Sequence, residues 1–369
     1  MLNKNNERAL VYLANVDEIQ PLTFLNGEGE LEEAANIEIL ITGGWKLIVQ
    51  KNRFEVHNLF VFCEVDTILP VDIPTFAFLE GKRIRTKKLK GVVSQGVAFT
   101  IPEIIDVMSL TTFGTEHYRF WEDVEFEIGN DWTELVKATK YDEYSNNGRK
   151  GDGVKLPPAN ARGAFPSFIH KTDEERIQNL AKELKYDWQG KEVVITEKLD
   201  GSSITIYCRL YDFTGLDVGI CSRNLNLKLD HENHFVTTGY TIREKLTSYC
   251  ILNSRSLALQ GEIIGPGIQG NPYKLTEHEI YFFNVFDIDA GKRLPHGQAL
   301  KIMSECNALS VPRVGYGTLR GSMETIIAQA DETSQLNEKT NREGIVIRAL
   351  DGSFSFKVIS NKWLLKEKE

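Results

Sequence analysis

A lysine at the end of an apolar segment is the feature of this sequence best suited to covalent chemistry. Lys198 follows the apolar residues 193–195 and precedes Asp200 and Gly201. A neutral lysine amine can attack phosphorus, and burial or a neighbouring cation favours that form by lowering the lysine pKa. In a strand, positions 198 and 200 share a face, so that Asp200 can help to hold a hydrated metal ion near Lys198. Because Asp-Gly is also a common hairpin signal, the motif can alternatively be a surface turn between two strands.

Four segments further along the chain place polar or aromatic residues on expected strands. Glu262 lies between apolar residues, Phe283 belongs to an aromatic run, Glu343 directly precedes a glycine and a β-branched strand, and Lys357 lies in the strand expected at 353–358. A lone strand-edge carboxylate is more often a paired structural residue than a ligand, and most aromatic residues in a strand pack in the core. A lysine in such a strand is suited to contacting phosphate. The individual segments are ambiguous, but their order along the chain is informative.

This order resembles that of the covalent nucleotidyltransferases, the superfamily of ATP-dependent ligases and capping enzymes. Within it, the whole chain resembles the RNA ligase family that carries an OB domain at its amino terminus, sometimes called the fifth RNA ligase family. The resemblance also includes residues 44–49, 64–70, 88–96 and 160–166.

The resemblance implies an ATP-dependent RNA ligase that uses Mg²⁺ or Mn²⁺. Lys198 is expected to attack the α-phosphate of ATP and release pyrophosphate, leaving a lysyl-N-AMP intermediate. AMP then passes to a 5′-phosphate, and a 3′-hydroxyl displaces AMP to form the phosphodiester. Asp200 and Glu343 are expected to hold the waters of the metal ion, Glu262 to bind the ribose and Phe283 to stack on adenine.

Four more nucleotide contacts are implied by the same resemblance. Lys357 is expected to contact the α-phosphate, and Arg223 to contact AMP or the incoming 5′-phosphate. Arg176 is expected to reach the leaving phosphates, although it equally fits a solvated helical side chain, and Glu197 is expected to help recognise adenine. Many members of the superfamily have a second lysine two positions after Lys357, where this chain is apolar. That charge is therefore absent, or is supplied by Lys362 or another segment.

The pattern of elements predicts an α+β protein with two domains. Short strands expected at 9–15, 37–42, 45–50, 59–65 and 92–100 favour an OB-like β-barrel over residues 1–150. Residues 151–170 have little periodicity and are expected to form a linker. Residues 171–369 are expected to form the nucleotidyltransferase domain, with antiparallel sheets and flanking helices, the first beginning at Thr172 with Glu175 in a capping box. The strands of this domain are expected at 191–198, 203–210, 257–264, 280–288, 344–349 and 353–358, and further helical patterns lie near 239–248, 297–308 and 323–330.

Composition limits the partners and the compartment. A net charge of −9 argues against broad non-specific binding to nucleic acid, but residues 82–90 carry six basic side chains that suit either a local nucleic-acid contact or a solvated edge strand. The expected partner is RNA or a nicked RNA/DNA duplex with RNA on the 3′-hydroxyl side. The lack of a long apolar run and the polar start predict a soluble, cytoplasmic protein without a membrane partner, and we expect a monomer. The five widely spaced cysteines match neither a disulfide framework nor a zinc site.

Two alternatives belong to different classes. A guanylyltransferase capping enzyme would use GTP, but such enzymes place an OB domain after the lysine strand, and few residues follow Lys357 here. A non-catalytic nucleic-acid-binding protein would need none of the set Lys198, Asp200, Glu262, Glu343 and Lys357. The sequence therefore favours the ligase.

Overall fold

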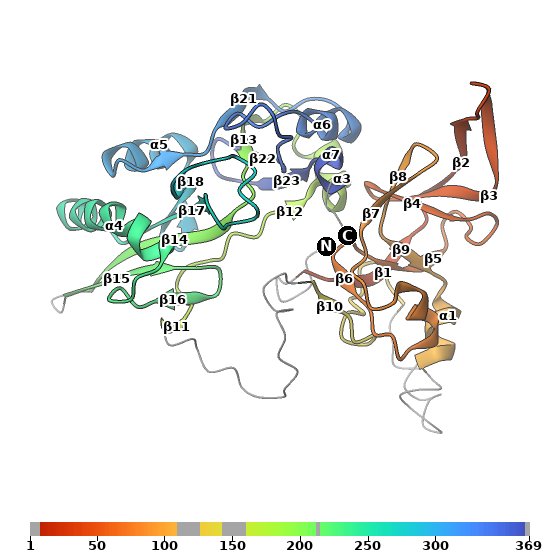
Figure 1. Ribbon diagram of the computed structural model, residues 1–369, viewed down its shortest axis with the longest axis horizontal. Coiled ribbons are helices and arrows are strands. Elements are labelled where there is room, and N and C mark those ends of the chain that lie inside the picture. Colours follow the sequence, from red (N-terminus) through yellow and green to blue (C-terminus); the bar gives the residue numbers. More distant parts are fainter. Residues whose placement is uncertain (1–7, 109–125, 142–159, 212–214, 366–369) are drawn as a thin grey trace. The chain divides into compact units, whose positions relative to one another are not determined.

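The chain forms two compact units, which are described separately (Figure 1). The computed structural model describes residues 8–108, 126–141, 160–211 and 215–365, so residues 151–159 of the expected linker lie outside the described residues. The first unit is drawn from Met1–Gly151, Glu175–Leu184 and Leu364–Glu369, and the second from Asp152–Glu174 and Lys185–Trp363.

The first unit is built mainly from short antiparallel strands. The strands and helices before residue 141 are β1 (Val11–Asn15), β2 (Glu18–Leu25), β3 (Leu31–Thr42), β4 (Trp45–Gln50), β5 (Leu59–Cys63), β6 (Thr67–Ile68), the 3₁₀ helix η1 (Pro74–Leu79), β7 (Thr86–Leu89), β8 (Val92–Gln95), β9 (Val97–Phe99), α1 (Ile101–Met108) and β10 (Thr139–Lys140). They pair as β1-β5-β9, β2-β3-β4, β6-β10 and β7-β8. Among the described residues these are separate small sheets, so the strand pairing does not close into a continuous barrel.

A buried carboxylate links the segment at Glu175–Leu184 to these strands. Glu64 is fully buried and accepts hydrogen bonds from Arg8, Tyr12 and the side-chain amide of Asn179, at 2.7, 3.1 and 3.0 Å. Burial opposes the charge of Glu64, but Arg8, the hydrogen bond from Asn179 and other nearby positive charge together outweigh burial and lower the pKa of Glu64 to about 2. The indole N–H of Trp45 donates to Asn179 at 2.6 Å. Asn179 thus fixes a segment distant in sequence to the strands of the first unit.

The prediction that a helix begins at Thr172 is wrong. Glu175–Arg176 is the short strand β12, followed by the 3₁₀ helix η4 (Ile177–Leu180) and the helix α3 (Ala181–Tyr186). The carboxylate of Glu175 accepts from the Arg176 backbone N–H at 2.9 Å and from Asn179 at 2.8 Å, so Glu175 does not occupy the third position of a capping box. Arg176 pairs with Asp66 at 3.1 Å and Asn179 bonds to Glu64, so contacts with residues far away in the chain override the local helical pattern here.

The second unit contains two antiparallel sheets. The larger sheet has the order β11 (Ala161–Ala164), β16 (Leu225–Leu227), β15 (Gly215–Cys221), β14 (Ser202–Tyr211), β17 (Leu257–Ile264), β18 (Glu279–Asp287) and β19 (Lys292–Arg293), and β20 (Leu309–Ser310) pairs parallel to β18. In the smaller sheet the order is β23 (Ser355–Ile359), β22 (Gly344–Ala349), β13 (Glu192–Lys198) and β21 (Arg313–Thr318). Six of these strands, β13, β14, β17, β18, β22 and β23, lie within two residues of the expected ranges, whereas β11, β15, β16, β19, β20 and β21 have no counterpart among the expected strands.

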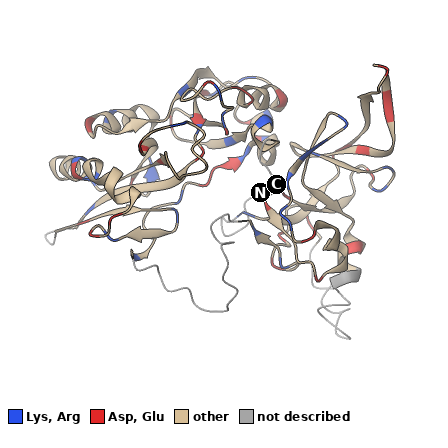
Figure 2. Cartoon of the chain, in the orientation of Figure 1, with Lys and Arg blue, Asp and Glu red and all other residues tan. Residues whose placement is uncertain are grey.

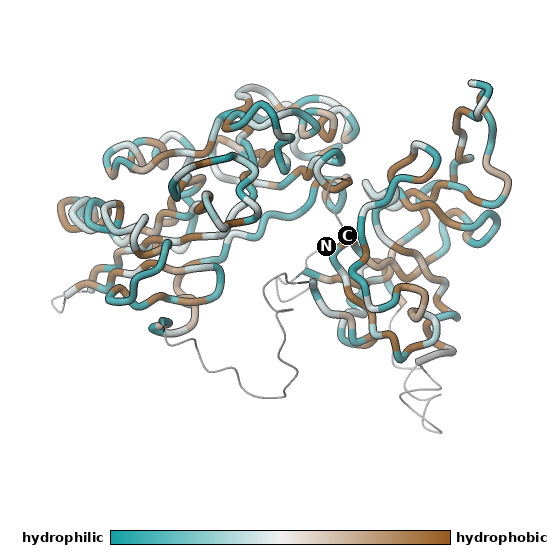
Figure 3. Tube along the Cα trace, in the orientation of Figure 1, coloured by the Kyte–Doolittle hydropathy of each residue, from teal (hydrophilic) through white to brown (hydrophobic). Residues whose placement is uncertain are grey.

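Four helices complete the second unit: α4 (His234–Asn253), α5 (His296–Glu305), α6 (Met323–Ala330) and α7 (Asn361–Leu364). Asn233 caps α4 by accepting from the Val236 backbone N–H, and the helix packs against β14 and β15. The helix α5 packs against β18, and α6 packs against β22 and β23. The strands of both units hold much of the hydrophobic colour in Figure 3, in keeping with buried cores. None of the described helices combines the length and the apolar character needed to cross a bilayer.

The Lys-x-Asp-Gly segment connects the two sheets and is not a hairpin. The segment follows β13 in the smaller sheet and precedes β14 in the larger one, and these strands do not pair. A β-carbon on Gly201 would lie 2.9 Å from Cγ of Glu262, so this glycine permits β17 to approach the turn closely. The interpretation as a surface hairpin turn is therefore wrong.

Candidate active site

Lys198 and Glu343 form a two-oxygen ion pair at the ends of adjacent strands. The Nζ atom of Lys198 lies 2.6 Å from Oε1 and 2.7 Å from Oε2 of Glu343. The register of β13 and β22 places Lys198 opposite Gly344, which brings Glu343 alongside the amine. A β-carbon on Gly344 would collide with the carbonyl oxygen of Val358, so this close strand pairing requires glycine. The side chain of Lys198 remains 28% exposed and is therefore accessible to a substrate.

Glu262 adds a second carboxyl group to this ion pair. Burial alone would lower the pKa of Lys198, as the sequence analysis anticipates, but Glu343 and Glu262 outweigh burial and raise it. Burial raises the pKa of Glu262 to about 8; Glu343 adds to this rise and Lys198 opposes it. One ammonium therefore neutralises Glu343, and Glu262 retains its proton at neutral pH. The carboxylates near Lys198 therefore favour its ammonium form, which is the opposite of the effect of burial alone.

The turn after Lys198 is held by a tyrosine. The backbone N–H of Asp200 donates to the hydroxyl of Tyr273 at 2.6 Å, and Tyr273 packs with Leu199 in a small core cluster. Asp200 lies close enough to Lys198 to raise its pKa. In the described part of the chain no group of three or more His, Cys, Asp or Glu side chains could hold a metal by itself. Two carboxylates that bind through water suit a hydrated Mg²⁺ or Mn²⁺ that also binds substrate phosphates.

A cavity of about 250 Å³ lies beside Phe283. Its lining includes Thr196, His296 and Arg348 together with apolar residues of α5 and the segment at 310–313. Thr196 shares a strand face with Lys198, because alternate side chains point the same way. Arg348 donates to Oγ1 of Thr196 at 3.1 Å, and its guanidinium carbon lies 5.3 Å from the centre of the Phe283 ring. The cavity therefore offers a flat aromatic face next to the strand that carries the lysine.

The two expected phosphate contacts Arg223 and Lys357 meet at one carboxylate. Asp173 lies 3.3 Å from Arg223 and 3.5 Å from Lys357. Lys357 of β23 lies opposite Val346 of β22. The side chain of Lys357 is 16% exposed, whereas that of Arg223 is 61% exposed. The structure thus brings these two cations together, with a carboxylate between them.

Three other expected residues have different surroundings. The carboxylate of Glu197 accepts from the Gln335 backbone N–H at 2.8 Å, on the strand face opposite to Lys198. Arg176 belongs to the first unit, where it is buried against Asp66. The ammonium of Lys362 donates to the carbonyl oxygen of Asp331 at 2.8 Å, at the end of α6.

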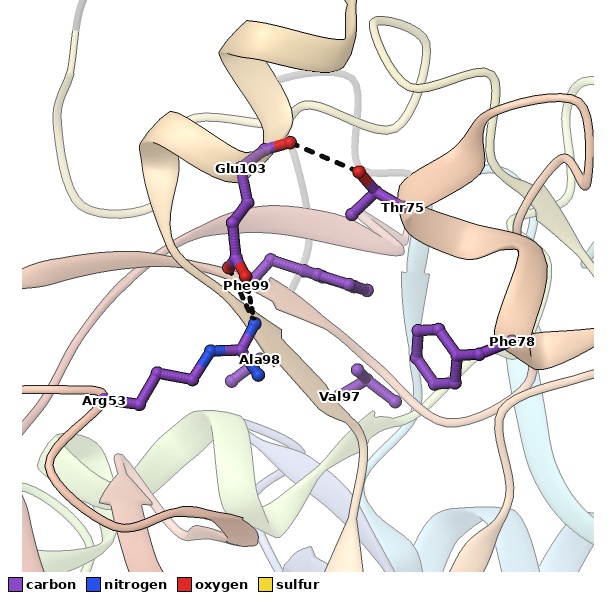
Figure 4. A pocket seen from close by; sticks show the side chains of 7 residues that line it. All are labelled: Arg53, Thr75, Phe78, Val97, Ala98, Phe99 and Glu103. Atoms are coloured by element: carbon purple, nitrogen blue, oxygen red, sulfur yellow. Dashed lines mark hydrogen bonds and ion pairs between the residues drawn. The ribbon is translucent and has the colours of Figure 1, made fainter.

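A second cavity, of about 490 Å³, lies in the first unit (Figure 4). Arg53 and Glu103 form an ion pair at one side of it, with Nη2 lying 2.6 and 2.7 Å from the two carboxylate oxygens, and Phe78 and Phe99 contribute aromatic surface. Its lining contains no lysine, and its single cation is already paired. Lys198 belongs to the other unit.

The sequence analysis missed several residues of the site. Arg348 lies in the β-branched strand that follows Glu343. Because alternate side chains of a strand share a face, Arg348 lies on the same face as Val346, which is the face that carries Lys198. Tyr273 lies in a loop without regular periodicity, and Asp173 and Glu174 lie upstream of the lysine motif. No local pattern identifies these three residues, because their contacts come from distant strands.

Comparisons with known proteins identify the family. A family model described as RNA ligase matches residues 191–363, and a model of an OB-fold domain matches residues 13–101. A solved structure of an RNA ligase mutant from Naegleria gruberi, with AMP and Mn, is 31% identical to the chain; the alignment covers 97% of this chain and 98% of the ligase, with a TM-score of 0.78. The chain belongs to the RNA ligase family. No curated protein matches it.

Two more structures of the Naegleria RNA ligase are similar to this RNA ligase family member. One is a mutant with ATP and Mn, at 31% identity, 96% and 98% coverage and a TM-score of 0.78. Another contains PPi, at 32% identity, 97% and 98% coverage and a TM-score of 0.78. The predicted RNA ligase with an amino-terminal OB-fold domain and a sheet-rich second domain is thereby confirmed.

Replacing Glu262 by glutamine is expected to stabilise the protein at alkaline pH. The folded-state pKa of about 8 exceeds the unfolded value, so the contribution of this carboxyl to stability is full below the unfolded pKa and is lost as the pH rises through about 8. The free energy of unfolding of Glu262→Gln should therefore exceed that of the parent protein by about 1 kcal/mol or more at about pH 9. Near pH 4 the two free energies should follow the same trend with pH. Urea unfolding across this pH range measures the difference, with Glu277→Gln, an exposed site, as the control. Parallel pH profiles for parent and Glu262→Gln would show that Glu262 is ionised in the folded protein.

Proposed function

We propose that this RNA ligase seals ends through a covalent adenylate on Lys198. In the first step Nζ forms a bond to the α-phosphorus of ATP while the bond to pyrophosphate breaks, and the lysine loses a proton. AMP then passes to a 5′-phosphate, and attack by a 3′-hydroxyl forms the phosphodiester and releases AMP. Such in-line phosphoryl transfers depend mainly on positioning and charge neutralisation. The ATP, AMP, Mn and PPi present in the Naegleria structures support this set of reactants.

The observation that carries this proposal is the contact of both Glu343 oxygens with Nζ of Lys198, at 2.6 and 2.7 Å. This contact fixes the amine at the strand end, but it also keeps the amine protonated. Catalysis therefore requires Glu343 to release the ammonium. Glu343 and Asp200 are suited to hold a divalent ion through water, and such an ion supplies neutralisation of the phosphate charge. Once Glu343 turns from Lys198, the lysine loses the carboxylate that contributes most to its raised pKa.

The remaining site residues are proposed to position the nucleotide. Phe283 provides the stacking face beside the cavity, and Glu262, which retains its proton, can donate to a ribose oxygen. Lys357 and Arg223 are proposed to exchange Asp173 for phosphate oxygens, because the triphosphate of ATP carries more negative charge than the one carboxylate that these two cations share. The proposed roles of Glu197 in adenine recognition and of Arg176 at the leaving phosphates rest on family resemblance alone.

The proposed substrate is a nicked duplex with RNA on the 3′-hydroxyl side. The OB-fold unit carries the hairpin β7-β8, in which Lys87, Lys88 and Lys90 are exposed, and Figure 2 shows basic residues along it. Phosphate contacts from such lysines supply affinity without reading sequence. We therefore propose this hairpin as the contact to the duplex that flanks the nick.

Replacing Lys198 by alanine is expected to abolish labelling of the protein by α-labelled ATP, because the amine that Glu343 holds is removed. The Lys191→Ala variant, which alters an exposed lysine at the start of the same unit, is the matched control and should label normally. Mass spectrometry of labelled peptides should place the adduct on residue 198. Labelling by GTP instead of ATP would favour a capping enzyme, and nucleic-acid binding without labelling by either nucleotide would favour a binding protein.

Replacing Lys87 and Lys88 together by alanine is expected to weaken binding to a nicked duplex. Each lost phosphate contact should reduce the magnitude of the slope of log affinity against log salt by about 0.9. The slope of the double variant should therefore be shallower by up to about 1.8. Adenylylation by ATP should stay unchanged, because these lysines belong to the other unit. Replacing the exposed Lys301 and Lys339 together by alanine is the control, because it removes the same amount of positive charge outside the hairpin. An unchanged salt slope in the Lys87 and Lys88 variant would exclude the hairpin from the duplex contact.

A further inference from the structure

A buried carboxylate upstream of the lysine strand joins three segments of the second unit. Glu174, whose side chain is 11% exposed, lies 2.8 Å from Nη1 of Arg293 and 3.7 Å from Nη2 of Arg348. It also accepts a short hydrogen bond from the hydroxyl of Ser355, which in turn accepts from Arg293 at 2.7 Å. Glu174 therefore connects the segment that precedes Glu175 to β19, β22 and β23.

Glu174 stays ionised in this position. Burial opposes its charge, but Arg348 and Arg293 outweigh burial and lower the pKa of Glu174. Without this carboxylate, two guanidinium groups would lie near one another with no anion between them. A buried charge without a partner is costly, so Glu174 is needed to keep Arg348 in place.

Arg348 is held from three sides. Glu174 attracts its Nη2, Thr196 accepts from its Nη1 at 3.1 Å, and the ring of Phe283 lies 5.3 Å from its guanidinium carbon. Its Nε–H is buried and has no hydrogen-bond acceptor among the described residues, so the donors of this guanidinium are not all satisfied. A buried donor of a charged group is seldom left unsatisfied. Because Arg348 also lines the cavity beside Phe283, a ligand in that cavity can supply an acceptor to the guanidinium.

We propose that Arg348 contacts the nucleobase stacked on Phe283, donating to an unprotonated ring nitrogen, and that Glu174 is the positioning residue that fixes this donor. The inference rests on the proposed function, since it takes ATP as the occupant of the cavity. Arg348 then reads an acceptor on the edge of the base, while Phe283 supports its face. The residue next to Glu174 is Asp173, which lies between the proposed phosphate contacts, so one short segment influences both ends of the nucleotide.

Deaza analogues of ATP test the base contact directly. Each of the 1-, 3- and 7-deaza forms replaces one ring nitrogen by C–H and so removes one acceptor. Calorimetry on the full chain carrying Lys198→Ala measures binding of ATP with magnesium without adenylylation. One analogue is expected to bind about tenfold more weakly than ATP, as for the loss of one charge-assisted hydrogen bond. Equal affinity for ATP and all three analogues would overturn the proposal.

Glu174→Gln and Arg348→Met, each added to Lys198→Ala, test which residues produce that preference. The preference is the ratio of the affinity for ATP to the affinity for the deaza analogue that binds most weakly. Arg348→Met should bind ATP and this analogue equally, and Glu174→Gln should reduce the preference to less than about threefold. The matched control is Asp287→Asn, which breaks a partly buried ion pair with Arg255, 2.6 Å long, in the same unit. It should lower the melting temperature to a similar degree and keep the full preference. A preference that survives in Glu174→Gln, or one that is lost in Asp287→Asn as well, contradicts a positioning role. Glu174→Gln also carries the test if Arg348→Met fails to fold.

Failure of the underlying function gives a different result. Phe283→Ala in the same background should weaken ATP binding about tenfold through lost stacking. If Phe283→Ala binds ATP normally, the nucleotide does not occupy this cavity and the proposed site is wrong. If Phe283→Ala loses affinity while the deaza analogues match ATP, only the contact from Arg348 is wrong.

Discussion

The ion pair between Lys198 and Glu343 is the interaction on which the site depends. It holds the amine at the end of β13 and favours the ammonium form of Lys198, because two carboxylate oxygens lie 2.6 and 2.7 Å from that amine. Burial raises the pKa of the half-buried Glu262 to about 8, and the negative charge of Glu343 adds to this rise. In the proposed mechanism, the amine becomes reactive once Glu343 turns away from it toward the divalent ion.

The turn between the two sheets makes this arrangement possible. Residues on the smaller sheet supply Lys198, Glu343 and Lys357, whereas β17 and β18 of the larger sheet supply Glu262 and Phe283. Gly201 allows the larger sheet to approach the turn, and Tyr273 holds the backbone of Asp200. Chemistry that needs a nucleophile, carboxylates and an aromatic face is thus assembled where the chain passes from one sheet to the other.

Much of this could be predicted from sequence, because the strands that carry the site have strong local patterns. The expected strands at 257–264 and 344–349 and the helix at 323–330 coincide with β17, β22 and α6. The start at Thr172 failed because Arg176 and Asn179 bond to residues far away in the chain, and no helical pattern reports such contacts. The raised pKa of Lys198 and the network around Glu174 were likewise inaccessible, since both depend on which strands become neighbours and at what register.

The state of the Lys198 amine is the most direct test of this account. Its pKa can be measured in the nucleotide-free protein by nuclear magnetic resonance titration of the lysine side chains, with Lys198→Arg used to assign the signal. The account predicts a pKa above the ordinary lysine value of about 10.4 and a fall when Glu343 is replaced by glutamine. A Lys198 amine that titrates below the ordinary value with Glu343 intact would contradict it.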